Sequence, residues 1–248
     1  MEARKKITAC QKKQEHTVII ECRNLKKTYV ADGQAVTAVD DVNLSIAAGD
    51  FAIILGHSGS GKTTLLSMIG GLTTPDSGEV LVNGIENWHQ SDARLTEMRN
   101  QTIGFIFQFA SLIPTLTALE NILLPLSFGN RKAASSRQAR DILAQVGLKD
   151  RENAFPAQLS GGQQRRIAIA RAFINQPAII LADEPTGDLD EDTEQEILAV
   201  FHEYHRQGTT FVVVTHNVHL ADSQESPRIL HMRKGVLSEE NPARTRAA

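Results

Sequence analysis

A glycine-rich octapeptide constrains this chain more than any other part of its sequence. Gly56-His57-Ser58-Gly59-Ser60-Gly61-Lys62-Thr63 directly follows the apolar run Phe51–Leu55. The octapeptide matches the pattern GxxxxGK[ST], in which glycines let successive N–H groups converge on phosphate oxygens at a helix N-terminus. The apolar run predicts a strand buried on both faces, and Thr63–Gly70 predicts the helix that follows. The sequence therefore predicts an α/β fold with a phosphate-binding loop.

This loop implies roles for particular side chains. Lys62 would reach the β- and γ-phosphates, and the Thr63 hydroxyl would ligate Mg²⁺. A carboxylate that holds the magnesium through water should end a buried strand, and Asp183 stands where an apolar run stops. The neighbouring Glu184 is placed to orient or deprotonate an attacking water, since a second carboxylate beside the metal ligand suits that task.

Composition excludes several classes of protein. The 248 residues hold 26 Lys and Arg against 29 Asp and Glu, and this balance argues against nucleic-acid binding through the overall field. Cys10 and Cys22 cannot build a disulfide framework, which favours a reducing compartment. No apolar run approaches the ~18 residues of a membrane helix. Any membrane role is therefore expected to come through a partner.

Short β-rich runs alternate with helical stretches along the chain, as in α/β proteins. The expected strands are Val18–Cys22, Val39–Ile46, Phe51–Leu55, Glu79–Val82, Ile103–Phe107, Ala178–Ala182 and Phe211–Val214. The expected helices are Thr63–Gly70, Arg137–Val146, Gln163–Ile174 and Thr193–Arg206. Turns are expected at Ala31-Asp32-Gly33 and Pro75-Asp76-Ser77-Gly78. One domain over 17–238 is predicted, with a helical insertion at about 108–175 and loose tails at 1–16 and 239–248.

The pentapeptide Leu159-Ser160-Gly161-Gly162-Gln163 points to a family. Read from its residues, Ser160 and Gln163 form a capping box that opens a helix, and the two glycines leave the helix amides uncovered as an anion site. The same pentapeptide is the signature sequence of ATP-binding cassette (ABC) proteins, and the chain resembles their nucleotide-binding subunits over roughly 17–238. The resemblance implies a RecA-like P-loop NTPase core with a mostly parallel sheet, an antiparallel β-subdomain and an inserted α-helical subdomain.

Further residues match motifs of this family in the expected order. Gln108 resembles the Q-loop glutamine, Asp188-Leu189-Asp190 the D-loop, His216 the switch histidine, and Tyr29 the aromatic residue that stacks on adenine. The D-loop reads Gly187-Asp188 where Ser-Ala is commoner in the family and Asn stands at the second position in the branch considered below.

The resemblance completes the expected site. Its catalytic residues are Lys62, Glu184 and His216, and its magnesium ligands are Thr63, Gln108 and Asp183. Its nucleotide-binding residues are Tyr29, Gly56, His57, Ser58, Gly59, Ser60, Gly61, Lys62, Thr63, Thr64, Gln108, Ser160, Gly161, Gly162, Gln163, Asp183, Glu184 and His216.

The resemblance also implies partners. Two such subunits pair head-to-tail around two ATP molecules, each held between one phosphate loop and the signature of the other subunit. ATP binding closes the dimer and hydrolysis reopens it, which drives a separate integral membrane permease. The chain is thus expected as a peripheral subunit at the cytoplasmic face of the inner membrane, with no nucleic-acid partner.

Two segments narrow the branch. Residues 99–108 (RNQTIGFIFQ) and 113–121 (IPTLTALEN) resemble the bacterial lipoprotein-releasing and macrolide-export ATPases, whose permeases carry large extracytoplasmic domains. Phe109–Leu126 would form the groove that grips the permease, although the same side chains also suit an ordinary helical core. An alternative is an ATP-driven transmembrane regulator of an extracytoplasmic cell-wall hydrolase. A soluble cassette protein of DNA repair or translation is disfavoured, because only 50 residues separate Gln108 from Leu159.

Overall fold

Two β-sheets and a group of helices make up the computed structural model of this chain, which describes residues 17–31, 33–128, 136–187, 189–222 and 227–239. The larger sheet has the order β10-β9-β3-β8-β7-β6. Its strands are β3 (Phe51–Leu55), β6 (Ile103–Ile106), β7 (Ile179–Asp183), β8 (Thr210–Thr215), β9 (Arg228–Arg233) and β10 (Val236–Glu239). All neighbouring pairs run parallel except β9–β10.

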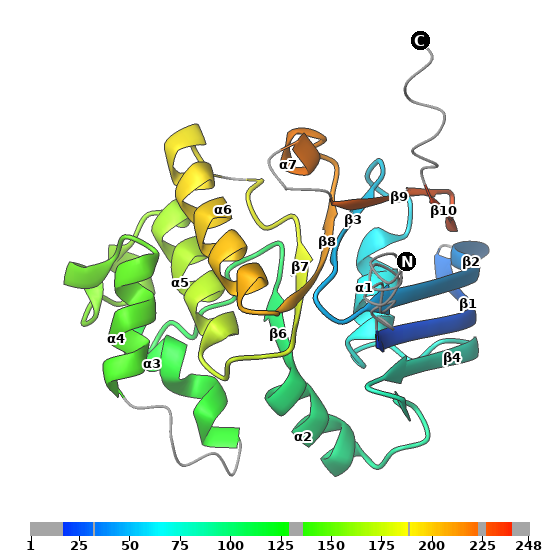
Figure 1. Cartoon of the computed structure of the whole chain (residues 1–248), viewed down its shortest axis with the longest axis horizontal. Helices are drawn as coiled ribbons and strands as arrows, with labels where there is room; N and C mark the ends of the chain where they lie inside the picture. The colour runs from blue at the N-terminus through cyan, green and yellow to red at the C-terminus, as the bar shows by residue number, and fades with distance from the viewer. Residues whose placement is uncertain (1–16, 32, 129–135, 188, 223–226, 240–248) are drawn as a thin grey trace, which may run out of the picture.

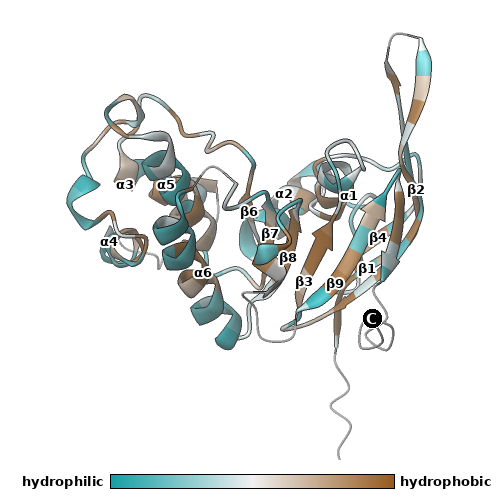
Figure 2. Ribbon diagram, turned by 90° about the horizontal axis from the view of Figure 1, so that it is seen from above, coloured by the Kyte–Doolittle hydropathy of each residue, from teal (hydrophilic) through white to brown (hydrophobic). Residues whose placement is uncertain are grey.

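The smaller sheet is antiparallel and has the order β2-β1-β4-β5. Its strands are β1 (Val18–Ala31), β2 (Gln34–Ala47), β4 (Ser77–Val82) and β5 (Ile85–Glu86). Figure 2 shows the β1–β2 hairpin reaching beyond the other strands. The predicted α/β class, with a mostly parallel sheet and an antiparallel β-subdomain, is confirmed.

Helices cover the larger sheet on both sides. Between β6 and β7 lie α3 (Ala118–Leu123), η1 (Leu124–Phe128), α4 (Ser136–Gln145), η2 (Lys149–Arg151), η3 (Pro156–Gln158) and α5 (Gly161–Phe173). The remaining helices are α1 (Lys62–Ile69), α2 (Asp92–Thr102), α6 (Glu191–Arg206) and α7 (His219–Asp222). In Figure 1, α3 to α6 lie on one side of β6, β7 and β8, and the antiparallel sheet lies on the other side.

Alternating side chains of the parallel strands pack into two separate cores. In β3, Phe51 and Ile53 face the core under α3 to α6, whereas Ala52 and Ile54 face the core around α1 and the antiparallel sheet. Successive side chains of a strand point to opposite faces, so an uninterrupted apolar strand serves both cores at once. This explains why β3, β7 and β8 are buried at every position.

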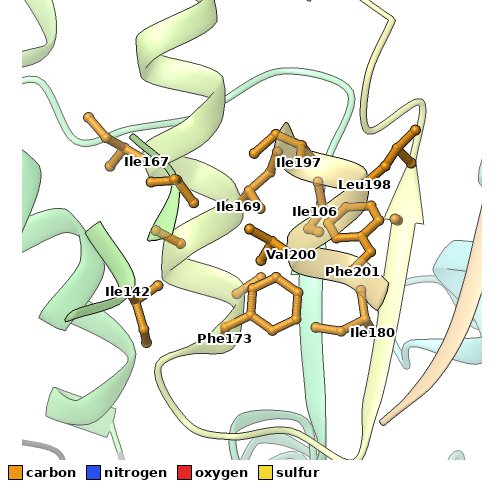
Figure 3. Close-up of a cluster of buried hydrophobic side chains, with 14 of the residues drawn as sticks. Ile106, Ile142, Ile167, Ile169, Phe173, Ile180, Ile197, Leu198, Val200 and Phe201 are labelled. Atoms are coloured by element: carbon orange, nitrogen blue, oxygen red, sulfur yellow. The ribbon is translucent and has the colours of Figure 1, made fainter. Parts of the chain in front are cut away.

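The core under the helices is rich in aromatic rings. Phe201 of α6 is fully buried, and its ring centroid lies 5.3 Å from that of Phe211 on β8 and 6.1 Å from that of Phe173 on α5. Phe173 in turn stacks on Tyr204 at 4.0 Å. Figure 3 shows Phe173, Phe201 and Ile180 meeting between the two helices and the sheet. These contacts fix the helices against the strands whose ends form the site described below.

Several expected elements were incomplete. β1 and β2 each have 14 residues instead of short strands, and Ser77 and Gly78 begin β4 instead of ending a turn. The strand expected over Ile103–Phe107 ends one residue earlier, at Ile106. The sequence analysis missed α2, which buries only Leu95 and therefore has no apolar stripe. It also missed β9 and β10, and β10 contains Glu239, which was assigned to the tail.

Two other expectations lie partly or wholly outside the described residues. These are the tails at 1–16 and 240–248 and the hairpin turn at Asp32. Within the described ranges, no helix combines the length and apolar character needed to cross a bilayer.

The aromatic core predicts a large loss of stability for Phe201→Ala. Removing a fully buried phenylalanine leaves a cavity and is expected to lower the free energy of unfolding by about 3–5 kcal/mol. Gln195→Ala, at an exposed position of the same helix, is the matched control and should change it by less than about 0.5 kcal/mol. Urea unfolding followed by circular dichroism measures both, and similar midpoints for the two variants would contradict this packing.

Candidate active site

The glycine-rich loop connects β3 to α1 and leaves the start of that helix open. Gly61 is the N-cap residue of α1, and no side chain caps the helix. Its φ of 105° lies in the left-handed region, and a Cβ there would sit 1.9 Å from the Ala38 carbonyl oxygen, so only glycine fits. The Ser60 Oγ is buried, with no hydrogen-bond partner among the described residues. Open amides and an unsatisfied hydroxyl suit a phosphate-bearing ligand.

Lys62 spans this loop. Its side chain is 7% exposed, and its Nζ donates to the Gly56 carbonyl at 2.7 Å and to the His57 carbonyl at 3.3 Å. An ammonium group has three donors, so these two bonds hold the charge at the pocket while leaving capacity for an anionic ligand. Gly56 and His57 thus act through their main-chain oxygens, and neither belongs to the pocket lining.

Asp183 ends β7 opposite the start of α1. Its Oδ2 accepts a hydrogen bond of 2.8 Å from Thr63 Oγ1. Burial raises the pKa of the Asp183 carboxyl, while the Thr63 hydrogen bond lowers it and the neighbouring Glu184 charge raises it further. A hydroxyl and a carboxylate oxygen placed side by side are ligands that Mg²⁺ prefers. The residues present therefore fit a magnesium ion.

Glu184 has a strained backbone and a firmly held carboxylate. Its φ of 46° lies in the left-handed region, which costs a non-glycine residue on the order of 1 kcal/mol. Its carboxylate accepts hydrogen bonds from Thr215 Oγ1 at 2.7 Å and from the His216 main-chain N–H at 3.0 Å. His216 Nδ1 lies 2.8 Å from the same carboxylate. The ends of β7 and β8 thus meet at the candidate catalytic pair.

Four residues of this network were missed by the sequence analysis, namely Thr186, Glu194, Thr215 and Asn217. Thr215 holds Glu184 and also accepts a hydrogen bond of 3.0 Å from the Asn217 N–H. Glu194 of α6 accepts from Thr186 Oγ1 at 2.7 Å and from Asn217 Nδ2 at 3.4 Å. Thr215 directly precedes His216, which was the one available signal. No motif marks Glu194, whose partners lie 8 and 23 residues away in the sequence.

One pocket of about 400 Å³ gathers most of the expected residues. Its lining includes Tyr29, Ser58, Gly59, Ser60, Gly61, Lys62, Thr63, Thr64, Gln108, Asp183, Glu184 and His216. Ala38 and Gly187 also line it and were not expected. Tyr29, on β1, is 42% exposed, with Lys27 Nζ 5.7 Å from its ring centroid. An exposed aromatic face at the rim of a phosphate pocket suits a nucleotide base.

The signature pentapeptide lies elsewhere. Ser160 Oγ accepts from the Gln163 N–H at 3.2 Å and Gln163 Oε1 accepts from the Ser160 N–H at 3.0 Å, so the expected capping box is present at the start of α5. None of Ser160, Gly161, Gly162 and Gln163 lines the pocket. Of the D-loop residues, Asp190 caps α6 and Asp188 lies outside the described residues.

Comparisons with known proteins show which family the chain resembles. The family model described as ABC transporter matches residues 39–187. The uncharacterized ABC transporter ATP-binding protein YvrO of Bacillus subtilis (strain 168) is 44% identical over 220 residues, which are 88% of this chain and 95% of that protein.

Two solved structures are also similar. One is a dimeric post-hydrolysis state of the ATP-binding cassette MJ0796 bound to ADP and Pi, with a TM-score of 0.83 at 42% identity. The other is a dimeric structure of MJ0796, described as a bacterial ABC transporter cassette, with the same TM-score at 43% identity. Each alignment covers 89% of this chain and 98% of the solved chain. The chain belongs to the ABC transporter family, as an ATP-binding subunit with an ABC ATPase domain.

Proposed function

We propose that this subunit pairs with a second copy around two ATP molecules and drives a separate permease for lipoprotein release or efflux. The observation that carries this proposal is the separation of the signature from the pocket within one chain. A pocket that lacks the signature of its own chain can be completed by another copy. The dimeric structures of the similar cassette MJ0796 support this arrangement.

The nucleotide would lie along the pocket from Tyr29 to the start of α1. Tyr29 would stack on adenine, while the open amides of α1, the Ser60 hydroxyl and the Lys62 ammonium would bind the phosphates. Thr63, Asp183 and Gln108 would hold Mg²⁺, which when bound supplies positive charge beside the β- and γ-phosphates.

Glu184 would act as the general base. A water molecule attacks the γ-phosphorus, its proton passes to the Glu184 carboxylate, and the bond to the β-phosphate oxygen breaks to leave ADP and inorganic phosphate. The hydrogen bonds from Thr215 and His216 orient the carboxylate before the reaction. His216, which is 64% exposed in its side chain, would contact the γ-phosphate from the end of β8.

The proposed permease site is an apolar groove of about 420 Å³ beside the parallel sheet. Its lining includes Leu72, Phe105, Phe107, Leu124, Pro125 and Phe128. Phe107 and Phe128 are 41% and 68% exposed, and exposed aromatic side chains around a groove are typical of protein docking. Only part of the expected stretch Phe109–Leu126 lines it, because Ile122 is fully buried and Leu119 and Leu123 pack on the helical core.

Docking through this groove would place the chain at the cytoplasmic face of the inner membrane as a peripheral subunit. The resemblance of residues 99–108 and 113–121 supports a permease with large extracytoplasmic domains. The alternative, a regulator of a cell-wall hydrolase, uses the same ATPase site. Identification of the permease that co-purifies from native membranes discriminates between the two.

Glu184→Gln is expected to abolish turnover while keeping ATP binding. The amide cannot take the proton from water, so the ATPase rate should fall by at least about 100-fold. ATP should then trap a dimer, detected by light scattering coupled to size-exclusion chromatography. Glu203→Gln, at the far end of α6, is the control. A variant that retained near-normal hydrolysis would remove Glu184 as the base.

Lys62→Ala should instead weaken nucleotide binding. Loss of the ammonium removes a charged partner of the phosphates, so we expect the Kd for ATP to rise by about tenfold or more. Isothermal titration calorimetry measures this change. Lys149→Ala, an exposed lysine of η2, serves as the control. Unchanged affinity in Lys62→Ala would contradict the assignment of the phosphate loop.

Phe128→Ser tests the groove. Phe128 is exposed and lies outside the pocket lining, so the substitution should change stability little and leave the ATPase rate of the isolated subunit within about twofold of that of the wild-type chain. Co-purification of an integral membrane protein from detergent-solubilised native membranes should be lost. Val236→Ser, at an exposed apolar position on β10, should retain it. Equal recovery with both variants would place the permease elsewhere.

A further inference from the structure

Arg165 is a buried cation to which the sequence analysis gave no role. It lies on α5, five residues after Ser160, and is 3% exposed. A buried charge is strongly unfavourable unless polar groups surround it. The groups that stabilise the Arg165 guanidinium therefore indicate what this residue does.

The guanidinium directs its hydrogen bonds to five main-chain carbonyl groups. The acceptors are the carbonyl oxygens of Phe107, Gln108, Asp183, Glu184 and Pro185. Nε lies 3.1 Å from the Pro185 oxygen, and Nη2 lies 3.4 Å from the Asp183 oxygen. Nη1 contacts the oxygens of Phe107 and Gln108, and Nη2 also contacts that of Glu184. A guanidinium has five N–H donors, so one side chain can serve all five of these acceptors.

These acceptors belong to the two segments that carry catalytic groups. Phe107 and Gln108 follow the end of β6, and the other three acceptors lie at and after the end of β7. β6 and β7 are paired strands, but their ladder ends at Ile106 and Ala182. Beyond that point no strand pairing fixes Gln108 against Glu184. The Arg165 side chain fills this place and joins the two segments directly.

The strained backbone of Glu184 needs contacts such as that of Arg165 to hold it in place. A residue at φ 46° persists in that conformation only when its surroundings hold it there. The Glu184 N–H donates to the Val214 carbonyl at 2.9 Å, and Arg165 binds its carbonyl oxygen. Both main-chain groups of Glu184 are thereby held, one by β8 and the other by α5.

We propose that Arg165 is a positioning residue for ATP hydrolysis, which holds the main chain of Gln108 and of Glu184 in one geometry. It does not line the pocket and acts through these two residues. This inference rests on the proposed role of Glu184 as the base. A lysine cannot replace it fully, because an ammonium has three donors and lacks the planar fork that reaches both segments.

The test compares Arg165→Lys and Arg165→Gln with Arg166→Lys. Arg166 is the matched control, since its Nη1 binds the Val146 carbonyl at 3.3 Å and Glu196 at 3.7 Å, away from the pocket. Displacement of a catalytic group by about 1 Å can cost about 100-fold in rate. We expect kcat to fall by about 10-fold in Arg165→Lys and by about 100-fold in Arg165→Gln, with the Kd for ATP within about threefold.

Hydrogen exchange gives a second readout that a purely structural role would not produce. In Arg165→Lys, faster exchange should be confined to peptides covering residues 105–112 and 182–188, with α5 unchanged. The inference is overturned if kcat of Arg165→Lys and Arg165→Gln equals that of Arg166→Lys, if the Kd for ATP rises as much as kcat falls, or if Arg165→Lys does not fold. If the wild-type subunit itself hydrolysed no ATP, the proposed function would be overturned instead.

Discussion

Parallel strands that are buried on both faces can present polar groups only where they end, and this constraint organises the whole site. β3, β7 and β8 are buried along their length, and their apolar side chains belong to the two cores, whereas the polar Asp183 and Thr215 stand at strand ends. Parallel strands also share one carboxyl edge. The phosphate loop, Gln108 and His216 follow β3, β6 and β8, and the Asp183–Glu184 pair stands at the end of β7. They meet at that edge because the strands are paired.

Main-chain and side-chain hydrogen bonds then fix the geometry that strand pairing leaves open. Thr63 joins α1 to β7 through Asp183, and Thr215 joins β8 to β7 through Glu184. Glu194 connects the turn after β7 with the turn after β8. Arg165 adds the helix that carries the signature to the same group of loops. Apart from the bond between Thr186 and Glu194, these contacts join segments that are distant in sequence, so the site depends on the packed core beneath it.

The helical insertion places the signature outside the pocket that contains the phosphate loop. The pocket opens at the carboxyl ends of the strands, whereas the signature opens α5 outside the pocket lining. The apolar groove lies against β6, α2, η1 and α5, and Phe107 at its edge directly precedes Gln108 in the pocket. A partner seated in this groove would therefore act on the chain segment that reaches the nucleotide.

The local chemistry of the site was determined by the sequence alone. A glycine loop between an apolar strand and a helix, two carboxylates at a strand end and a Ser-Gln capping box each depend on neighbours within a few residues, and such patterns survive in any tertiary context.

Elements without an apolar period could not be predicted from the sequence. α2 buries one residue, and β9 and β10 become strands through pairing with β3 and with each other. The left-handed Glu184 and its bonds to Thr215 and His216 were decided only by tertiary structure. Tertiary structure also decided which five carbonyls surround Arg165 and brought Ala38 and Gly187 to the phosphate loop. The physical reason is the same in each case, because these contacts form between the ends of separate strands and helices whose positions depend on how the two cores pack.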